Sequence, residues 1–240
     1  AILEPPGMER GKAEGRLYPV LIALHEVDSQ FETVDALKES EHGQGFAALA
    51  NRGVIVVLPM AAEGWQAPAM GRLLAVLRSG SLPVDPGRFS LAGVGSGADG
   101  VFAMLDALPG EWASATCINP TRMPDADRAK RFQTTTLRVV TDKLLSDQQA
   151  AAVRRRVGEF STNGLNVTLE TAEPLSPSPT EGTPSDLSFF ATLDFTQWLM
   201  EQHRTRDEAK NHPFNVGLKQ QVNPGSNDGP ASAGGAAAQP

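Results

Sequence analysis

At the centre of the 240-residue chain lies Phe89-Ser-Leu-Ala-Gly-Val-Gly-Ser-Gly-Ala-Asp-Gly100. The apolar residues at its start are typical of a buried strand, and the glycines that follow interrupt that strand with a tight turn. Apolar residues then recur at helical spacing, at Val101, Phe102, Met104, Leu105 and Leu108. The stretch therefore predicts a strand, a turn and a helix, the setting in which α/β proteins place their functional groups.

Further apolar runs of strand length lie on both sides of this stretch, and helical patterns separate them. Alternating strands and helices predict an α/β fold, a three-layer sandwich in which helices cover both faces of a mostly parallel sheet of about six or more strands. Functional groups are then expected at the carboxyl ends of the strands. The strands are predicted at Tyr18–Leu24, Val54–Leu58, Phe89–Ala92, Ala113–Asn119, Leu137–Asp142 and, more polar and so nearer an edge, Asn166–Glu170.

Composition divides the chain into three parts. Residues 1–16 are rich in proline, glycine and charge, and we expect an exposed lead-in there. Residues 17–203 carry the periodic patterns and form the α/β domain. Residues 204–240 are polar and end in a low-complexity run of Gly, Ala, Ser, Pro and Asn, which predicts a disordered C-terminal tail.

The overall composition excludes several classes of function. A net charge of −7 without a basic stripe argues against nucleic-acid binding. The single cysteine, Cys117, excludes an intrachain disulfide and is expected in the core. No apolar run approaches the ~20 residues of a membrane span. The compartment stays open, because a chain that begins at Ala1 is compatible with a processed or exported protein.

Two motifs compete for the central turn. Gly93-x-Gly95-x-x-Ala98 fits a dinucleotide-binding fingerprint, in which backbone N–H groups hold a pyrophosphate at a helix N-terminus. Gly93-x-Gly95-x-Gly97 fits a nucleophile elbow, G-x-S-x-G, whose serine is replaced by glycine. The fingerprint normally opens the first βαβ unit, whereas two predicted strands precede this turn, and Asn119-Pro120 after the next strand offers no acid for a ribose.

The order of these pieces resembles the α/β-hydrolase fold, in particular the esterase branch that includes polyhydroxybutyrate depolymerase-like, feruloyl-esterase-like and dienelactone-hydrolase-like enzymes. The resemblance covers Leu17 to His203. It implies an oxyanion loop after a strand that ends in histidine, a serine on the elbow, an acid after a later strand and a catalytic histidine before the last helix. The matching segments are Tyr18–His25, Gly53–Pro59, Val84–Gly93, Leu137–Asp142 and Phe195–Leu199.

The departures from this pattern fall on the residues that carry the chemistry. Gly95 stands at the nucleophile position and has no side chain. Ser96 follows one residue later, and on such a tight turn a shift by one residue points the side chain in another direction. No histidine occurs between His42 and His203, so the resemblance supplies no general base near the elbow.

The remaining two groups of the expected site differ as well. The glycine of the oxyanion loop, which should follow His25, is replaced by Glu26, and a carboxylate opposes a developing oxyanion. Asp142 aligns with the acid of the resemblance, but an acid without a base does no catalysis. We call Gly95, Ser96, Asp142, His25 and Glu26 the vestigial site.

The main hypothesis is therefore a pseudoenzyme: an α/β-hydrolase-like protein without hydrolase activity that acts as a structural or interaction subunit. One alternative is a serine esterase with a rearranged site around Ser96 and Asp142. A further alternative is dinucleotide binding at Gly93–Ala98. We expect no cofactor and no metal site, a protein partner bound through the tail at 204–240, and a cleft at the vestigial site that could still hold a small molecule.

Overall fold

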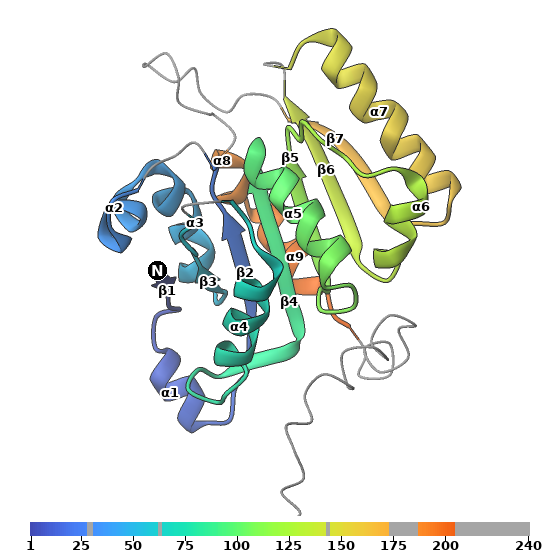
Figure 1. The fold of residues 1–240 in the computed structure, drawn as a ribbon. Coiled ribbons are helices and arrows are strands. Elements are labelled where there is room, and N and C mark those ends of the chain that lie inside the picture. The colour runs from blue at the N-terminus through green and yellow to red at the C-terminus, as the bar shows by residue number, and fades with distance from the viewer. Residues whose placement is uncertain (28–30, 62–63, 143–144, 173–186, 205–240) are drawn as a thin grey trace, which may run out of the picture.

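The computed structural model describes residues 1–27, 31–61, 64–142, 145–172 and 187–204. Over these ranges the chain forms a seven-stranded sheet in the order β1-β3-β2-β4-β5-β6-β7 (Figure 1). All neighbouring strands are parallel except β1 and β3. The strands are β1 (Ile2–Leu3), β2 (Tyr18–Leu24), β3 (Ile55–Val57), β4 (Val84–Val94), β5 (Ser114–Ile118), β6 (Thr136–Asp142) and β7 (Val167–Ala172).

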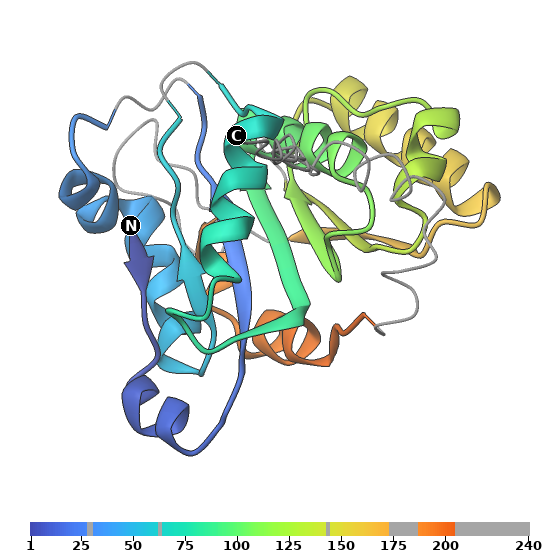
Figure 2. The same cartoon turned by 60° about the horizontal axis from the view of Figure 1, so that its bottom comes forward.

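Helices cover both faces of the sheet, as the alternating pattern predicts (Figures 1 and 2). One face packs against α4 (Ala67–Leu77), α5 (Ser96–Ala107) and α7 (Asp147–Thr162). The other packs against α2 (Val34–Glu39), α3 (Glu41–Asn51), α8 (Leu187–Phe190) and α9 (Leu193–Glu201). Three short helices complete the described part of the chain: α1 (Met8–Ala13), α6 (Ala126–Ala129) and a 3₁₀ turn at Lys130–Phe132. The α/β sandwich is thereby confirmed.

The central strands are buried on both sides, which explains why their sequences are continuously apolar. On β2 all seven residues are buried, and successive side chains alternate between the two layers. Ile22 and Leu24 belong to the core with α4 and α5, whereas Leu21 and Ala23 belong to the core with α3 and α9. Cys117 is fully buried on β5, as expected of a core residue, and this burial raises the pKa of its thiol.

The N-terminal segment corrects one expectation. Residues 1–16 are not simply an exposed lead-in, because Ile2 and Leu3 pair with β3 as an antiparallel edge strand. The side chains of Leu3 and Met8 are buried in the two cores. Two isolated apolar residues among prolines and charges suffice to fix this segment, and such a pattern is too sparse to predict a strand. Residues 205–240, nearly all of the predicted tail, lie outside the described residues.

Two other features bear on the sequence predictions. The helix α7 begins after Ser146 with a capping box, in which Ser146 and Gln149 satisfy each other's backbone N–H groups. Among the described residues, no helix is long and apolar enough to cross a membrane.

Candidate functional site

The turn between β4 and α5 has the geometry of a nucleophile elbow. Gly95 connects the two elements at φ 54° and ψ −121°, a conformation that residues with a side chain rarely adopt. Its N–H donates to the carbonyl oxygen of Ile118 on β5 at 3.0 Å, and its own carbonyl accepts the Asp99 N–H at 3.2 Å. The strained backbone of the elbow is thus present at the position where the sequence lacks the serine.

The two flanking glycines serve close packing. A Cβ built on Gly97 would overlap the carbonyl oxygen of Leu24 at the end of β2. A Cβ on Gly93 would overlap the backbone of Gly97 itself. Because each neighbour is main chain, neither contact can be relieved by turning a side chain. These glycines let α5 start directly against β4 and β2, which is the reason for the G-x-x-x-G spacing.

The Glu26 side chain fills the space above the elbow. A Cβ built on Gly95 would overlap Oε1 of Glu26, so the carboxylate occupies the position from which a nucleophile at residue 95 would project. An anion beside the first turn of α5 is also favoured by the helix dipole. The acid that the sequence places in the oxyanion loop therefore reaches the centre of the site.

Ser96 is the first residue of α5 and points back to the loop after β2. Its Oγ accepts the backbone N–H of Val27 at 2.9 Å. It does not cap its own helix, since Gly95 is the N-cap and no side-chain cap bond is formed. The hydroxyl thus ties the oxyanion-loop segment to the elbow.

His25 follows β2 and is engaged by backbone on both ring nitrogens. Nδ1 lies 2.7 Å from the carbonyl oxygen of Glu26, and Nε2 accepts the N–H of Ala61 at 3.3 Å. This pattern assigns the neutral tautomer with the proton on Nδ1. The ring also meets Phe31 and Trp65 edge-on, at 5.2 and 5.0 Å between centroids. His25 is 3% exposed, and burial lowers its pKa. It joins the ends of β2 and β3.

A second histidine, His203, lies at the opposite end of the sheet. His203 contacts Gly87, near the start of β4, whereas Gly95 follows the end of that strand. The two positions are eight residues apart along the strand direction, a distance of about 26 Å at roughly 3.3 Å per residue. The segment where the resemblance implies a catalytic histidine, 183–190, lies partly outside the described residues, and its sequence contains none.

The acids of the site hold strand-end loops. Asp142, at the end of β6, is 5% exposed, and its backbone N–H donates to Oδ1 of Asn119 at 3.0 Å. Asp99 accepts the N–H groups of Thr121 and Arg122 at 2.9 and 2.7 Å, together with the Thr121 hydroxyl. Asn119, which the sequence interpretation missed, bridges β5 and β6 at φ 49°; an asparagine after a strand, able to adopt such a φ, was the available signal.

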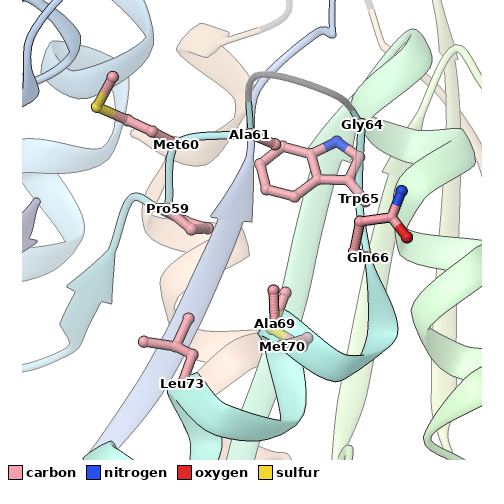
Figure 3. Close-up of a pocket in the computed structure, with 9 residues that line it drawn as sticks. All are labelled: Pro59, Met60, Ala61, Gly64, Trp65, Gln66, Ala69, Met70 and Leu73. Carbon is pink, nitrogen blue, oxygen red and sulfur yellow. The ribbon is translucent and has the colours of Figure 1, made fainter.

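A pocket adjoins the site on the side of α4. It has a volume of about 450 Å³ and lies between the loop 59–66 and the first turns of α4 (Figure 3). None of the five residues of the vestigial site lines it. No group of three or more His, Cys, Asp or Glu side chains that could hold a metal ion occurs within the described part of the chain.

Comparison with known proteins supports the fold. Neither a known family model nor a curated protein sequence matches the chain. Among solved structures, it is similar to a thermostable esterase at a TM-score of 0.66 and 17% identity, over 85% of this chain and 58% of the esterase. A ferulic acid esterase gives a TM-score of 0.60 at 14% identity, over 82% of this chain and 91% of that one. MPT51 (FbpC1) of Mycobacterium tuberculosis gives 0.57 at 13%, over 78% and 91%.

These likenesses confirm the α/β-hydrolase fold that the order of motifs predicts, and solved esterases are among its structural neighbours. The chain spans less than two thirds of the thermostable esterase. At such low identity the likeness concerns the fold, so the chemistry has to be argued from the residues of the elbow.

Proposed function

We propose that this chain is a non-catalytic protein with the α/β-hydrolase fold that acts as a structural or interaction subunit. The observation that carries the proposal is the pair of Gly95 and Glu26. The elbow presents no nucleophile, and a carboxylate occupies the space from which one would project. Negative charge at that point would also oppose the oxyanion of an acyl-transfer reaction.

The surroundings of Ser96 support the same conclusion. A serine needs a base within hydrogen-bond reach to give up its proton. The Ser96 hydroxyl holds a backbone N–H, both ring nitrogens of His25 face backbone groups, and His203 lies at the far end of β4. Asp142 is positioned at the end of β6, where an acid would serve a histidine from the segment 183–190, and the sequence has no histidine there.

The place where the tail leaves the domain favours an interaction role. The backbone N–H of Arg204 donates to the carbonyl oxygen of Gly87 at 2.8 Å, so the last described residue lies at the amino end of β4. A partner bound by residues 205–240 close to this point would contact the side of the sheet opposite the elbow. We expect the full chain to bind such a partner in a co-purification assay, and the chain that ends at Arg204 to lose it.

Ester hydrolysis tests the catalytic part. We expect the purified full chain to release p-nitrophenol from p-nitrophenyl acetate and butyrate no faster than its Ser96→Ala variant, and to remain unlabelled by a fluorophosphonate. A known serine esterase, assayed in parallel, shows that substrate and label are competent. Turnover that depends on Ser96 and Asp142 would overturn the proposal in favour of the rearranged esterase.

Cofactor binding is tested separately at the same turn. A pyrophosphate at Gly93–Ala98 would have to lie beside the Glu26 carboxylate, which repels it. We therefore expect no rise in melting temperature with millimolar NAD or NADP. A rise that Ala98→Glu abolishes would support the dinucleotide alternative.

A further inference from the structure

The pocket beside α4 has the size and shape of a small-molecule site. Its volume of about 450 Å³ falls within the roughly 300–1,000 Å³ of ligand pockets. Figure 3 shows its two walls: Pro59, Met60 and Trp65 belong to the loop after β3, and Ala69, Met70 and Leu73 belong to α4. The two walls are neighbours in the sequence, because the loop leads directly into α4.

The lining determines what kind of molecule fits. None of the described lining residues is charged, and Gln66 is the polar side chain among them. A charged ligand would lose its hydration without an ionic partner among these residues, whereas a neutral apolar one gains by leaving water. The thioether of Met70 and the indole of Trp65 can make favourable contacts with an aromatic ring. These properties select a neutral aromatic molecule.

The loop wall is held in place from behind. Gly100 lies within α5, where glycine costs about 0.5–1 kcal/mol relative to alanine. A Cβ at this position would overlap the Trp65 ring, so the glycine makes room for the indole. His25 supports the same loop through its bond to the Ala61 N–H and its edge contact with Trp65. These contacts fix Trp65 and Ala61 before a ligand binds, which lowers the entropic cost of binding.

From this arrangement we propose that the pocket between the loop 59–66 and α4 binds a small neutral aromatic molecule, at a site separate from the vestigial site. Binding there uses no residue of the elbow and does not depend on whether the elbow hydrolyses esters. His25, which the sequence assigns to the lost chemistry, then has a present role as a support for the pocket wall.

Two dyes that share one skeleton test the proposal. N-phenyl-1-naphthylamine is neutral, and 8-anilinonaphthalene-1-sulfonate is the same molecule with a sulfonate. We expect the full chain to bind one equivalent of the neutral dye, saturably, and to bind the sulfonate at least about tenfold more weakly, because its charge has no partner among the described lining residues. Equal or tighter binding of the sulfonate would overturn the ligand class.

A matched pair of variants tests the location. Ala69 and Ala75 are both exposed alanines on α4, but Ala69 lines the pocket and Ala75 does not. We expect Ala69→Trp, which places an indole at the mouth, to weaken the neutral dye at least about tenfold, and Ala75→Trp to leave it unchanged. Equal affinities of the two variants would overturn the proposed site.

Methyl resonances give a second measurement on the unaltered chain, in case Ala69→Trp fails to fold. The six methionines can carry ¹³C methyl labels, assigned by single Met→Leu variants. Ring currents of the neutral dye should shift Met60 and Met70 and leave Met8, which is buried elsewhere in the core, in place. Shifts confined to other methionines would contradict binding in this pocket.

Discussion

The elbow and the seam between β6, β7 and α9 are both polar regions on the same sheet, but they are stabilised in different ways. At the seam, Arg138 on β6 is 6% exposed by its side chain and bonds Glu170 through two nitrogens, at 2.6 and 2.7 Å. It also bonds Asp194 of α9 at 2.6 Å and lies over the rings of Phe189 and Trp198. Side chains make all of these contacts.

At the elbow, Gly93 and Gly97 pack main chain against main chain, and a Cβ at either position would overlap backbone atoms. A side chain at the seam can turn away from a substituted neighbour, whereas the backbone atoms around Gly93 and Gly97 cannot. The comparison explains how the form of the turn can be kept whatever residue stands at its centre. The turn is maintained by packing, and the reactive side chain contributes nothing to that packing.

Substitution of Gly97 should give the largest effect. The Cβ of Gly97→Ala would overlap the Leu24 carbonyl, and β2 and α5 cannot separate without loss of core packing. We expect a loss of about 3 kcal/mol or more in the free energy of unfolding, measured by urea denaturation. Gly158→Ala is the control, because Gly158 lies in α7 with no atom near its Cβ position, and should stabilise by about 0.5–1 kcal/mol. A similar gain at both positions would show that the elbow is not packing-limited.

Removal of the charge at the seam should give the next largest effect. Burial alone would lower the pKa of Arg138, but the hydrogen bonds and charges of Glu170 and Asp194 outweigh it and raise that pKa. Arg138→Met keeps much of the volume over Phe189 and Trp198 but removes the charge that pairs with Glu170 and Asp194. It should cost about 2 kcal/mol in the free energy of unfolding, and no more, because the two freed carboxylates can turn to water. Asp194→Asn, at a side chain 78% exposed, should cost less than about 1 kcal/mol by the same measurement. The reverse order of the two would contradict the assignment of Arg138 as the centre of the seam.

A serine restored at the elbow should have a smaller effect on stability and none on activity. Gly95→Ser should cost about 1–2 kcal/mol, since it forces a residue with a side chain to adopt φ 54° and displaces the flexible Glu26 carboxylate. In the Glu26→Ala background the cost should fall by about 0.5 kcal/mol or more, which a double-mutant cycle measures. Ester hydrolysis should stay at background in both, because His25 is bonded to backbone groups and His203 lies beside Gly87, so neither of these two histidines serves the new hydroxyl. Activity in the double variant would show that the site retains a base.

The strands and the elbow could be predicted from the sequence, but the direction of the side chains around the elbow could not. The apolar runs fix the strands, and the spacing of Gly93, Gly95 and Gly97 predicts the elbow, because close backbone packing needs the outer two glycines and a positive φ favours the middle one. The sequence also shows that Glu26 replaces a glycine. It could not show that the carboxylate reaches Gly95, since the direction of a loop side chain depends on contacts that form only in the folded chain.

Other features depend on segments distant in sequence. The edge strand at Ile2–Leu3 exists because β3 offers it an edge, not because of its own pattern. The role of Arg138 requires Glu170 and Asp194, which lie 32 and 56 residues away and are brought together by the sheet. The pocket wall likewise depends on Trp65 meeting Gly100. The spacing of apolar residues within one helix or strand does not predict contacts between residues so far apart in the sequence.

The smallest expected effect is a pH dependence that originates at His25. Burial lowers the pKa of His25 below its usual 6.5, so on acidification the unfolded chain takes up this proton before the folded chain does. The histidine therefore costs no stability above pH 6.5. As the pH falls below 6.5 stability is lost, and the loss levels off once the folded protein is protonated as well. In His25→Asn this part of the pH dependence should disappear, which urea denaturation at a series of pH values from 8 to 5 would measure. Protonation places a hydrogen on Nε2 against the Ala61 N–H, so the same acidification should weaken the support of the loop 59–66. Parallel pH profiles for the two proteins would mean that His25 does not cause this part of the pH dependence.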